Sequence, residues 1–316
     1  MARRRASLSE APIEVVAADT GSVSVLAVEA LPGATGLPGR RQSLGAVFWV
    51  SAGWVALMIL LAVFASFLHL RSPTAQDYSA VSAGPSIHHL LGTDDLGRDL
   101  LSRLIYGSRP SLIIGFAPVA IGLVVGGFLG LLAGYKGGVI DGSVNAVAFV
   151  ILAFPALLAI IVVDEFWNQP PRQLWKLVVM FAVVATPLLF RVLRATTLSF
   201  ANREFVVAAR AMGARTRRIL LRELLPNIVP AAVSFALIGV ATAIILEGSL
   251  AFLGLSVQIP NPSLGNIINE GTSNNLLSTD PFIALWPSLY TFLLLTTLNL
   301  MADRLRSYFD VREAKL

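Results

Sequence analysis

The chain has 316 residues, of which 55% are hydrophobic and 14% are charged, and its formal net charge at pH 7 is +5. A globular domain carries about 25% charged residues, so this composition predicts an integral membrane protein. The chain has no cysteine, which excludes disulfides and thiolate chemistry, and its three histidines are too few and too clustered to indicate a buried catalytic array.

Residues 1–43 are polar, rich in small residues and weakly patterned, and three consecutive arginines lie near their start. We expect a disordered cytoplasmic tail, because such a segment buries too little apolar surface to fold. The arginines are expected to act as topology determinants, with lipid or partner binding as the alternative. The first apolar run is too long for a signal peptide, so we expect it to stay as an anchor.

Six apolar stretches follow, and a membrane-spanning helix needs about 20 residues of this kind. They are residues 44–70, 111–135, 139–163, 174–199, 228–255 and 283–302. The prolines inside them are tolerable, because neighbouring helices can satisfy the backbone groups that proline frees. The sequence therefore predicts an all-α membrane protein with six spans over residues 44–310 and a cytoplasmic tail at 311–316.

Basic residues give the expected orientation of these spans. With the N-terminus inside the cell, 18 of the 24 lysine and arginine residues fall on cytoplasmic segments and six on the opposite side. Both termini and the loop at 200–226 are therefore expected in the cytoplasm. The arginines lie beside apolar spans, which favours membrane topology over nucleic-acid binding.

The expected outer segment at 90–112 reads LLGTDDLGRDLLSRLIYGSRPSL. Thr93 or Asp94 can cap a short helix here. Asp99 and Arg103 are four residues apart, so they are expected to pair on its surface. The segment is either an amphipathic element that shapes the assembly or a solvated helix with self-paired charges. The candidate residues at this outer interface are Asp94, Arg98, Asp99 and Arg103.

Four glycines recur every fourth residue along the second span, at positions 122, 126, 130 and 134. A stripe of this kind lets another helix approach closely. The partner helix could belong to the same chain or to a neighbouring subunit.

The most informative segment lies between the fourth and fifth spans, where residues 204–226 read EFVVAARAMGARTRRILLRELLP. Asn202 is expected as the N-cap of a short helix, and Gly213 as the left-handed residue just past its end. One face of this helix is shallow and rich in small residues, which suits a groove of another protein. That face consists of Phe205, Ala208, Ala209 and Met212.

Glu247 lies inside the fifth span. A carboxylate is costly in lipid, so we expect it to face a polar cavity or a partner. A role in a transport path and a structural pair with an arginine or a backbone donor are both open. Phe252 and Leu253, near the outer end of this span, could form part of an apolar gate or could simply pack.

Several motifs of chemical function are absent from the sequence. It contains no phosphate-binding G-x-x-x-x-G-K-[ST], no H-E-x-x-H and no nucleophile elbow. The spans also lack the ladder of acidic groups that proton-coupled transporters use. We therefore expect no catalytic residue, no metal site and no cofactor in this chain.

The 204–226 segment resembles the cytoplasmic "EAA" coupling loop in permease subunits of bacterial ABC importers. The family pattern is E-A-A, three residues, Gly, nine residues and I-x-L-P. The matching residues are Ala208, Ala209, Gly213, Leu225 and Pro226. Val207 takes the place of the family glutamate and Glu223 that of the isoleucine. Glu204 resembles the acidic residue that peptide-type permeases place three positions upstream.

Further stretches resemble the peptide and nickel branch of this family. Residues 90–112 resemble L-G-T-D-x-x-G-R-D-x-x-S-R-x-x-Y-G-x-R-x-S-L, and residues 247–265 resemble the family's stretch at the outer end of the fifth span. The glycine-rich turn at 134–141 resembles its short inner turn. The resemblance covers about residues 44–310.

The resemblance implies a type I ABC importer permease fold with a cytoplasmic coupling helix. It implies the second, C-type permease of a dipeptide or oligopeptide importer in a bacterial inner membrane. Its partners would be a sister permease, two cytoplasmic ATPases that bind ATP and magnesium, and an extracytoplasmic solute-binding protein. The ATPase-coupling residues would be Glu204, Phe205, Ala208, Ala209, Met212 and Gly213, and the residues of the path or gate would be Glu247, Phe252 and Leu253.

Other functions stay open at this point. One is a nickel or opine importer of the same family, because His88 and His89 lie on the expected outer side. Another, from a different class, is an autonomous secondary transporter or channel. Intramembrane charge pairs and the lack of an ATPase-docking loop would favour it, and the sequence shows the reverse. A membrane enzyme is the remotest alternative, since no site is visible.

Overall fold

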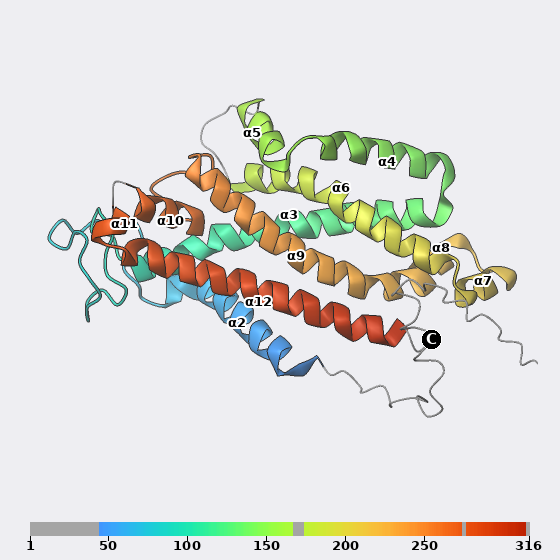
Figure 1. Ribbon diagram of the computed structural model, residues 1–316, viewed down its shortest axis with the longest axis horizontal. Helices are drawn as coiled ribbons and strands as arrows, with labels where there is room; N and C mark the ends of the chain where they lie inside the picture. The colour runs from blue at the N-terminus through green and yellow to red at the C-terminus, as the bar shows by residue number, and fades with distance from the viewer. Residues whose placement is uncertain (1–43, 167–173, 274–275, 314–316) are drawn as a thin grey trace, which may run out of the picture. The chain divides into compact units, whose positions relative to one another are not determined.

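The computed structural model describes residues 44–166, 174–273 and 276–313, which are mainly helical (Figure 1). The helices are α2 (Gly45–Phe64), α3 (Leu100–Lys136), α4 (Gly138–Ala153), α5 (Ala156–Phe166), α6 (Leu174–Ala201), α7 (Glu204–Ala211), α8 (Thr216–Arg218), α9 (Leu225–Phe252), α10 (Leu264–Thr272), α11 (Leu276–Thr279) and α12 (Phe282–Glu313). A 3₁₀ turn (Ala65–Phe67) follows α2, and a π-helical segment (Ile219–Leu224) joins α8 to α9. Within this part of the chain there is no strand, only an isolated bridge between Thr93 and Asp99. The expected all-α class is confirmed.

Five helical stretches in the described residues are long and apolar enough to cross a membrane. They are Gly45–Phe67, Leu100–Lys136, Leu174–Ala201, Thr216–Phe252 and Phe282–Phe309. Each contains most or all of one predicted span. The predicted third span, 139–163, is not one helix, because α4 and α5 meet at an angle of 87°. Phe154 is extended there (φ −86°, ψ 134°), as the ring of the following Pro155 requires.

The second span differs from its prediction at its start. α3 is one helix of 37 residues, and from Leu100 onward it includes the stretch that was expected to form a separate short helix. Its N-cap is Asp99, whose carboxylate accepts a hydrogen bond from the Ser102 backbone N–H at 2.9 Å. The predicted caps Thr93 and Asp94 are wrong, because residues 93–98 form a turn before the helix in which the Asp94 carboxylate accepts from the Leu96 and Arg98 backbone N–H groups.

The glycine stripe of α3 packs against α6 of the same chain. A Cβ at Gly126 would lie 2.4 Å from the Thr186 carbonyl oxygen, and one at Gly130 would lie 2.8 Å from that of Phe190. Both distances are far below van der Waals contact, so only glycine allows this approach. Lipid tails are as apolar as leucine, which leaves close packing of this kind as a main source of attraction between spans.

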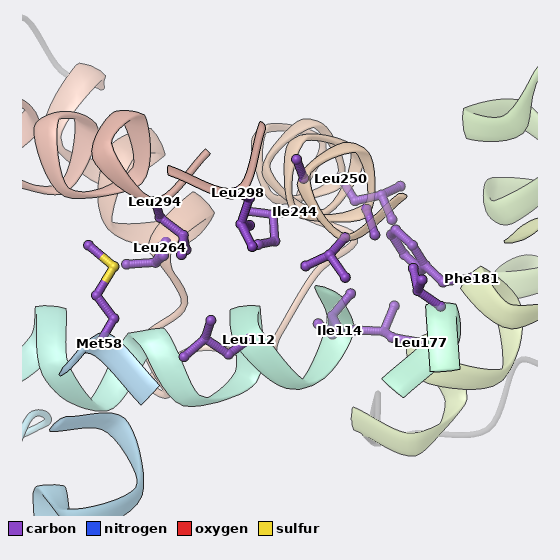
Figure 2. Packing of buried hydrophobic residues seen from close by; sticks show 14 of the residues in the cluster. Met58, Leu112, Ile114, Leu177, Phe181, Ile244, Leu250, Leu264, Leu294 and Leu298 are labelled. Atoms are coloured by element: carbon purple, nitrogen blue, oxygen red, sulfur yellow. The ribbon is translucent and has the colours of Figure 1, made fainter. Parts of the chain in front are cut away.

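A single apolar cluster joins most of the spans (Figure 2). It contains Met58 of α2, Leu112 and Ile114 of α3, Leu177 and Phe181 of α6, Ile244 and Leu250 of α9, Leu264 of α10, and Leu294 and Leu298 of α12. The short helix α10 therefore contributes to the same core as the long helices, which ties its position to theirs.

The two ends of the described bundle carry different short elements (Figure 1). α7 and α8 lie at one end, and α10 and α11 lie at the other, together with the segment between α2 and α3. We call these the α7 end and the α10 end. α12 continues to Glu313, so the first residues of the predicted tail at 311–316 extend this helix. The tail predicted at 1–43 lies outside the described residues.

Candidate functional site

The predicted coupling helix is α7, and it is shorter than expected at its start. Its N-cap is Arg203 rather than Asn202, and no side chain caps it. At its end Gly213 has a φ of +77°, as predicted. The Gly213 N–H donates to the Arg210 carbonyl and the Ala214 N–H to that of Ala209, both at 3.0 Å. These two bonds form a Schellman motif, which stops the helix at a defined residue.

The predicted contact face of α7 is divided between the interior and the surface. Phe205, Ala208 and Met212 are exposed, and Met212 has 82% of its surface accessible. Ala209 has only 6% accessible, so the prediction that it belongs to the exposed face is wrong. It shares the inward side of the helix with Val206, three residues earlier, because positions i and i+3 lie on one face.

The inward side of α7 fixes the whole loop to the spans. Val206 and Ala209 belong to a buried cluster with Phe200 of α6 and with Ile219 and Leu224 of the π-helical segment. The buried side of α7 therefore packs on the end of α6 and the start of α9, and this packing holds the exposed side in place. The surface around it is basic, since Arg215, Arg217, Arg218 and Arg222 are all exposed.

Two contacts connect this end to the turn between α3 and α4. The Arg210 guanidinium lies over the Tyr135 ring, with its central carbon 5.3 Å from the ring centroid. Arg194 of α6 binds Asp141 of α4 through both carboxylate oxygens, with the second nitrogen–oxygen distance at 2.6 Å. The sequence analysis included Tyr135 and Asp141 in the 134–141 segment that resembles the family's inner turn, but it predicted no contact for either residue.

At the α10 end, four charged side chains form a buried cluster, which we call the four-charge clamp. Its members are Asp94, Arg98, Arg103 and Glu270. Arg98 reaches Asp94 at 2.7 Å and Glu270 at 2.8 Å. Arg103 reaches the same two acids at 2.5 and 2.7 Å. Both arginines are 3% exposed or less.

The predicted surface pair between Asp99 and Arg103 does not form. Arg103 points to the clamp, while Asp99 caps α3 and contacts the His89 imidazole, with Oδ1 and Nδ1 3.0 Å apart. These charges are thus buried rather than solvated. Sequence reasoning found three of the four clamp residues and missed Glu270, which is 172 positions from Arg98 and lies on another helix.

Burial raises the pKa of the Glu270 carboxyl, and the nearby Arg103 and Arg98 oppose this shift. Its side chain keeps 20% of its surface accessible, so Glu270 is the least buried member of the clamp. It is also the only member outside residues 94–103. The contribution of α10 to the clamp therefore depends on this one carboxylate.

Glu247 of α9 is 1% exposed and lies among hydroxyl groups. Its carboxylate accepts hydrogen bonds from Ser111 of α3 at 3.1 Å and from Ser256 in the following loop at 2.5 Å. The Ser111 hydroxyl oxygen in turn accepts from the Leu264 backbone N–H at the start of α10, at 3.0 Å. Phe252 and Leu253, at the end of the same helix, are each about half exposed.

The sequence model of the family described as "Binding-protein-dependent transport system inner membrane component" matches residues 126–315. The chain belongs to this family. The match begins inside α3 and includes α7, the loop after it and α10, so both ends described above contain family residues.

Relatives extend the likeness beyond the family match. The glutathione transport system permease protein GsiD of Pectobacterium atrosepticum is 37% identical over 263 residues, which cover 83% of this chain and 86% of the relative. The dipeptide transport system permease proteins DppC of Alkalihalophilus pseudofirmus and Haemophilus influenzae are 34% and 32% identical. The two matches cover 81% and 85% of this chain, and 83% and 91% of the respective relatives.

A solved structure shows that this family member has the fold of an ABC importer permease. The inward-facing MetNI methionine ABC transporter contains a chain that matches with a TM-score of 0.56 at 21% identity. The match covers 66% of this chain and 97% of that one. At this level of identity the likeness concerns the fold alone, and it confirms the predicted fold class.

The described part of this permease family member offers no evident metal site. No group of three or more His, Asp or Glu side chains in these residues is arranged to hold a metal ion. His88 is exposed, and His89 is engaged by Asp99 and Arg71. His88 and His89 therefore do not form a joint ligand set in this structure.

Proposed function

We propose that this chain is a permease subunit of an ATP-driven importer for dipeptides or other short peptides, in which it forms half of the translocation path. The relatives support the solute class, since their names concern dipeptides and glutathione, a tripeptide. The chain covers more than four-fifths of their lengths, so the correspondence extends over almost the whole permease.

The observation that carries the proposal is the division of α7 into a buried side and an exposed apolar side. Val206 and Ala209 hold the helix in the core, while Phe205, Val207 and Met212 remain exposed. Exposed apolar side chains gathered on one short helix outside the spans are typical of an interaction site. In this family member we assign it to a cytoplasmic ATPase, whose motion α7 would pass to α6 and α9.

The orientation follows from charge. Eighteen of 24 basic residues lie on one side of the predicted spans, and this side carries α7 and both termini. The positive-inside rule assigns it to the cytoplasm of a bacterial inner membrane. The α10 end would then face outward, where a solute-binding protein delivers the peptide. A sister permease would supply the second half of the path.

The chain itself would not be an enzyme. Its sequence has no phosphate-binding loop. ATP and magnesium would therefore be bound by two partner ATPases, and the permease would contribute the path and the coupling helix without a cofactor of its own.

Reconstitution in proteoliposomes tests this function. The permease pair, its ATPases and its binding protein should accumulate labelled dipeptide or glutathione only when ATP is enclosed with the ATPases, and unlabelled peptide should compete. Uptake of Ni²⁺ instead of peptide would support the nickel importer. Uptake by this chain alone, driven by an ion gradient without ATP, would support a secondary transporter and overturn the proposal.

A further inference from the structure

α10 is a nine-residue helix at the end of the bundle that the proposed function turns outward. It follows the loop at 253–263, which continues from the exposed Phe252. A short helix in this place could be a lid that moves during transport or a fixed part of the wall. Its attachments to the neighbouring helices decide between these roles.

The four-charge clamp attaches the C-terminal half of α10 to the start of α3. Two acids and two arginines balance each other, and each arginine contacts both acids. Separating Glu270 from this group would leave Arg98 and Arg103 with Asp94 as the buried acid between them, while the partly exposed Asp95 lies 3.9 Å from Arg98. Leaving a buried charge uncompensated is strongly unfavourable, so the clamp resists opening.

A second attachment holds the N-terminal end of α10. The Leu264 N–H donates to Ser111 of α3, and the Ser111 hydroxyl donates to Glu247 of α9. Hydrogen bonds in a continuous chain polarise and strengthen one another. Both ends of the short helix are thus joined to α3 by buried polar contacts about two helical turns apart.

Close backbone packing leaves α10 no room to slide. A Cβ at Gly265 would lie 2.8 Å from the Cα of Gly248 in α9, and one at Gly271 would lie 2.7 Å from the Ala284 nitrogen in α12. On the α3 side, a Cβ at Gly107 would lie 3.2 Å from the Cβ of Pro262, next to the N-cap of α10. Three spans therefore enclose the helix.

We propose that Glu270 is a positioning residue for transport, which closes the four-charge clamp and keeps α10 fixed on α3 throughout the cycle. α10 is then part of a rigid wall and not a lid, and it holds the loop at 253–263 in one place. If α10 is fixed, outward opening would have to take place elsewhere, and the proposed function offers the contact with the sister permease. The inference rests on the proposed function for the direction in which this end faces.

A reversible cross-link tests whether α10 must move. In the Gly107→Cys/Pro262→Cys variant the two Cβ atoms start 3.2 Å apart, slightly under the 3.5–4.5 Å usual for disulfides. The natural chain has no cysteine, so the introduced pair is the only one. Bond formation is checked by mass, and uptake by the same proteoliposomes is compared before and after reduction. We expect rates within about twofold. A tenfold loss on oxidation that reduction restores would overturn the proposal.

A second measurement does not depend on which solute is carried. In the assembled complex, a single thiol at position 262 should react with maleimide equally slowly with and without ATP and vanadate. Glu270→Gln should increase this reactivity at least fivefold. Asp95→Asn is the matched control. Asp95 is 34% exposed and lies at the rim of the clamp, where its distance to Arg98 is 3.9 Å, longer than the contacts within the clamp. The assignment of Glu270 would be overturned if the thiol at position 262 reacted at an ATP-dependent rate with the native clamp. It would also be overturned if Glu270→Gln and Asp95→Asn gave the same rate.

These measurements separate the inference from the proposed function. If no peptide is taken up by the complex with its native clamp, the peptide assignment fails, while thiol reactivity still reports on α10. If the native complex takes up peptide but the oxidised Gly107→Cys/Pro262→Cys variant does not, the peptide assignment stands. The proposal that α10 stays fixed on α3 is then wrong. The cross-linked variant retains Glu270, so the test does not depend on the folding of Glu270→Gln.

Discussion

Arg210 of α7 lies over the aromatic ring of Tyr135 in the last turn of α3, with the guanidinium carbon 5.3 Å from the ring centroid. α7 therefore contacts a span that is not its neighbour in sequence. Beyond Tyr135, the first turn of α4 is held to α6 by the pair between Asp141 and Arg194. A displacement of α7 would reach α4 by this route as well as through α6 and α9.

The first prediction concerns this contact. Tyr135→Leu should reduce peptide uptake per ATP hydrolysed by about two- to fivefold, since an exposed cation–π contact contributes about 0.5–1 kcal/mol. ATPase recovery with the complex should stay normal, because Tyr135 is not on the exposed face of α7. Tyr106→Leu is the control: Arg109 lies 5.1 Å from the Tyr106 ring centroid, far from α7. An unchanged transport-to-hydrolysis ratio in Tyr135→Leu would contradict the route.

The second prediction separates docking from packing on α7. Ala208→Trp should leave the thermal stability of the permease unchanged but reduce co-purification of the ATPases about tenfold, because Ala208 is exposed. Ala209→Trp should instead lower the free energy of unfolding by about 1–3 kcal/mol, because a larger side chain overpacks the cluster around Val206 and Leu224. Equal effects of the two variants on stability would be inconsistent with the described orientation of the helix.

Local patterns predicted the elements of this protein better than their contacts. Gly213 could be assigned a positive φ from sequence because the end of a short helix demands it. The face of α7 could not be assigned fully, since helical spacing groups Ala208 with Ala209 while only the buried cluster shows which of them turns inward. The bend at Phe154 has a local cause in Pro155, yet apolar composition alone predicted one span over residues 139–163 without the bend.

Contacts between residues far apart in the chain could not be predicted from sequence spacing. Asp99 and Arg103 have the separation of a helical pair, but the helix begins only after Asp99, and the capping bond to Ser102 uses its carboxylate. Arg103 is then free to meet Asp94 and Glu270. The link to Glu270 depends on how α10 folds back on α3, which no local pattern contains.

The third prediction tests orientation. Ser86→Cys and Thr216→Cys each place one thiol at an exposed position, at the α10 and α7 ends respectively. In intact cells a membrane-impermeant maleimide should label the first and not the second, and disruption of the membrane should make both reactive. Labelling in the opposite order would place both termini outside and would remove α7 from the reach of cytoplasmic ATPases.

The last prediction concerns the role of Glu247. Its carboxylate is almost fully buried and accepts from Ser111, which also binds the backbone of α10, so we expect an anchoring role. Ser111→Ala leaves the Leu264 N–H without its acceptor, and Glu247→Gln replaces one acceptor oxygen with a donor. Each should destabilise the complex by about 1–3 kcal/mol, the usual cost of an unsatisfied buried polar group.

Ser249→Ala is the control for both variants, because the Ser249 side chain is half-buried and its hydroxyl donates to the Ile245 carbonyl of the same helix. Heating the purified complex and measuring the fraction that stays assembled compares all three. If Glu247 anchors α10, the Ser111→Ala and Glu247→Gln complexes dissociate at lower temperature than Ser249→Ala, and uptake falls with assembly. If the charge of Glu247 instead lines the path, Glu247→Gln retains full assembly and loses uptake, while Ser111→Ala transports normally. The burial of the carboxylate between α3 and α9 favours the first result, since a group that meets a passing peptide must be accessible to it.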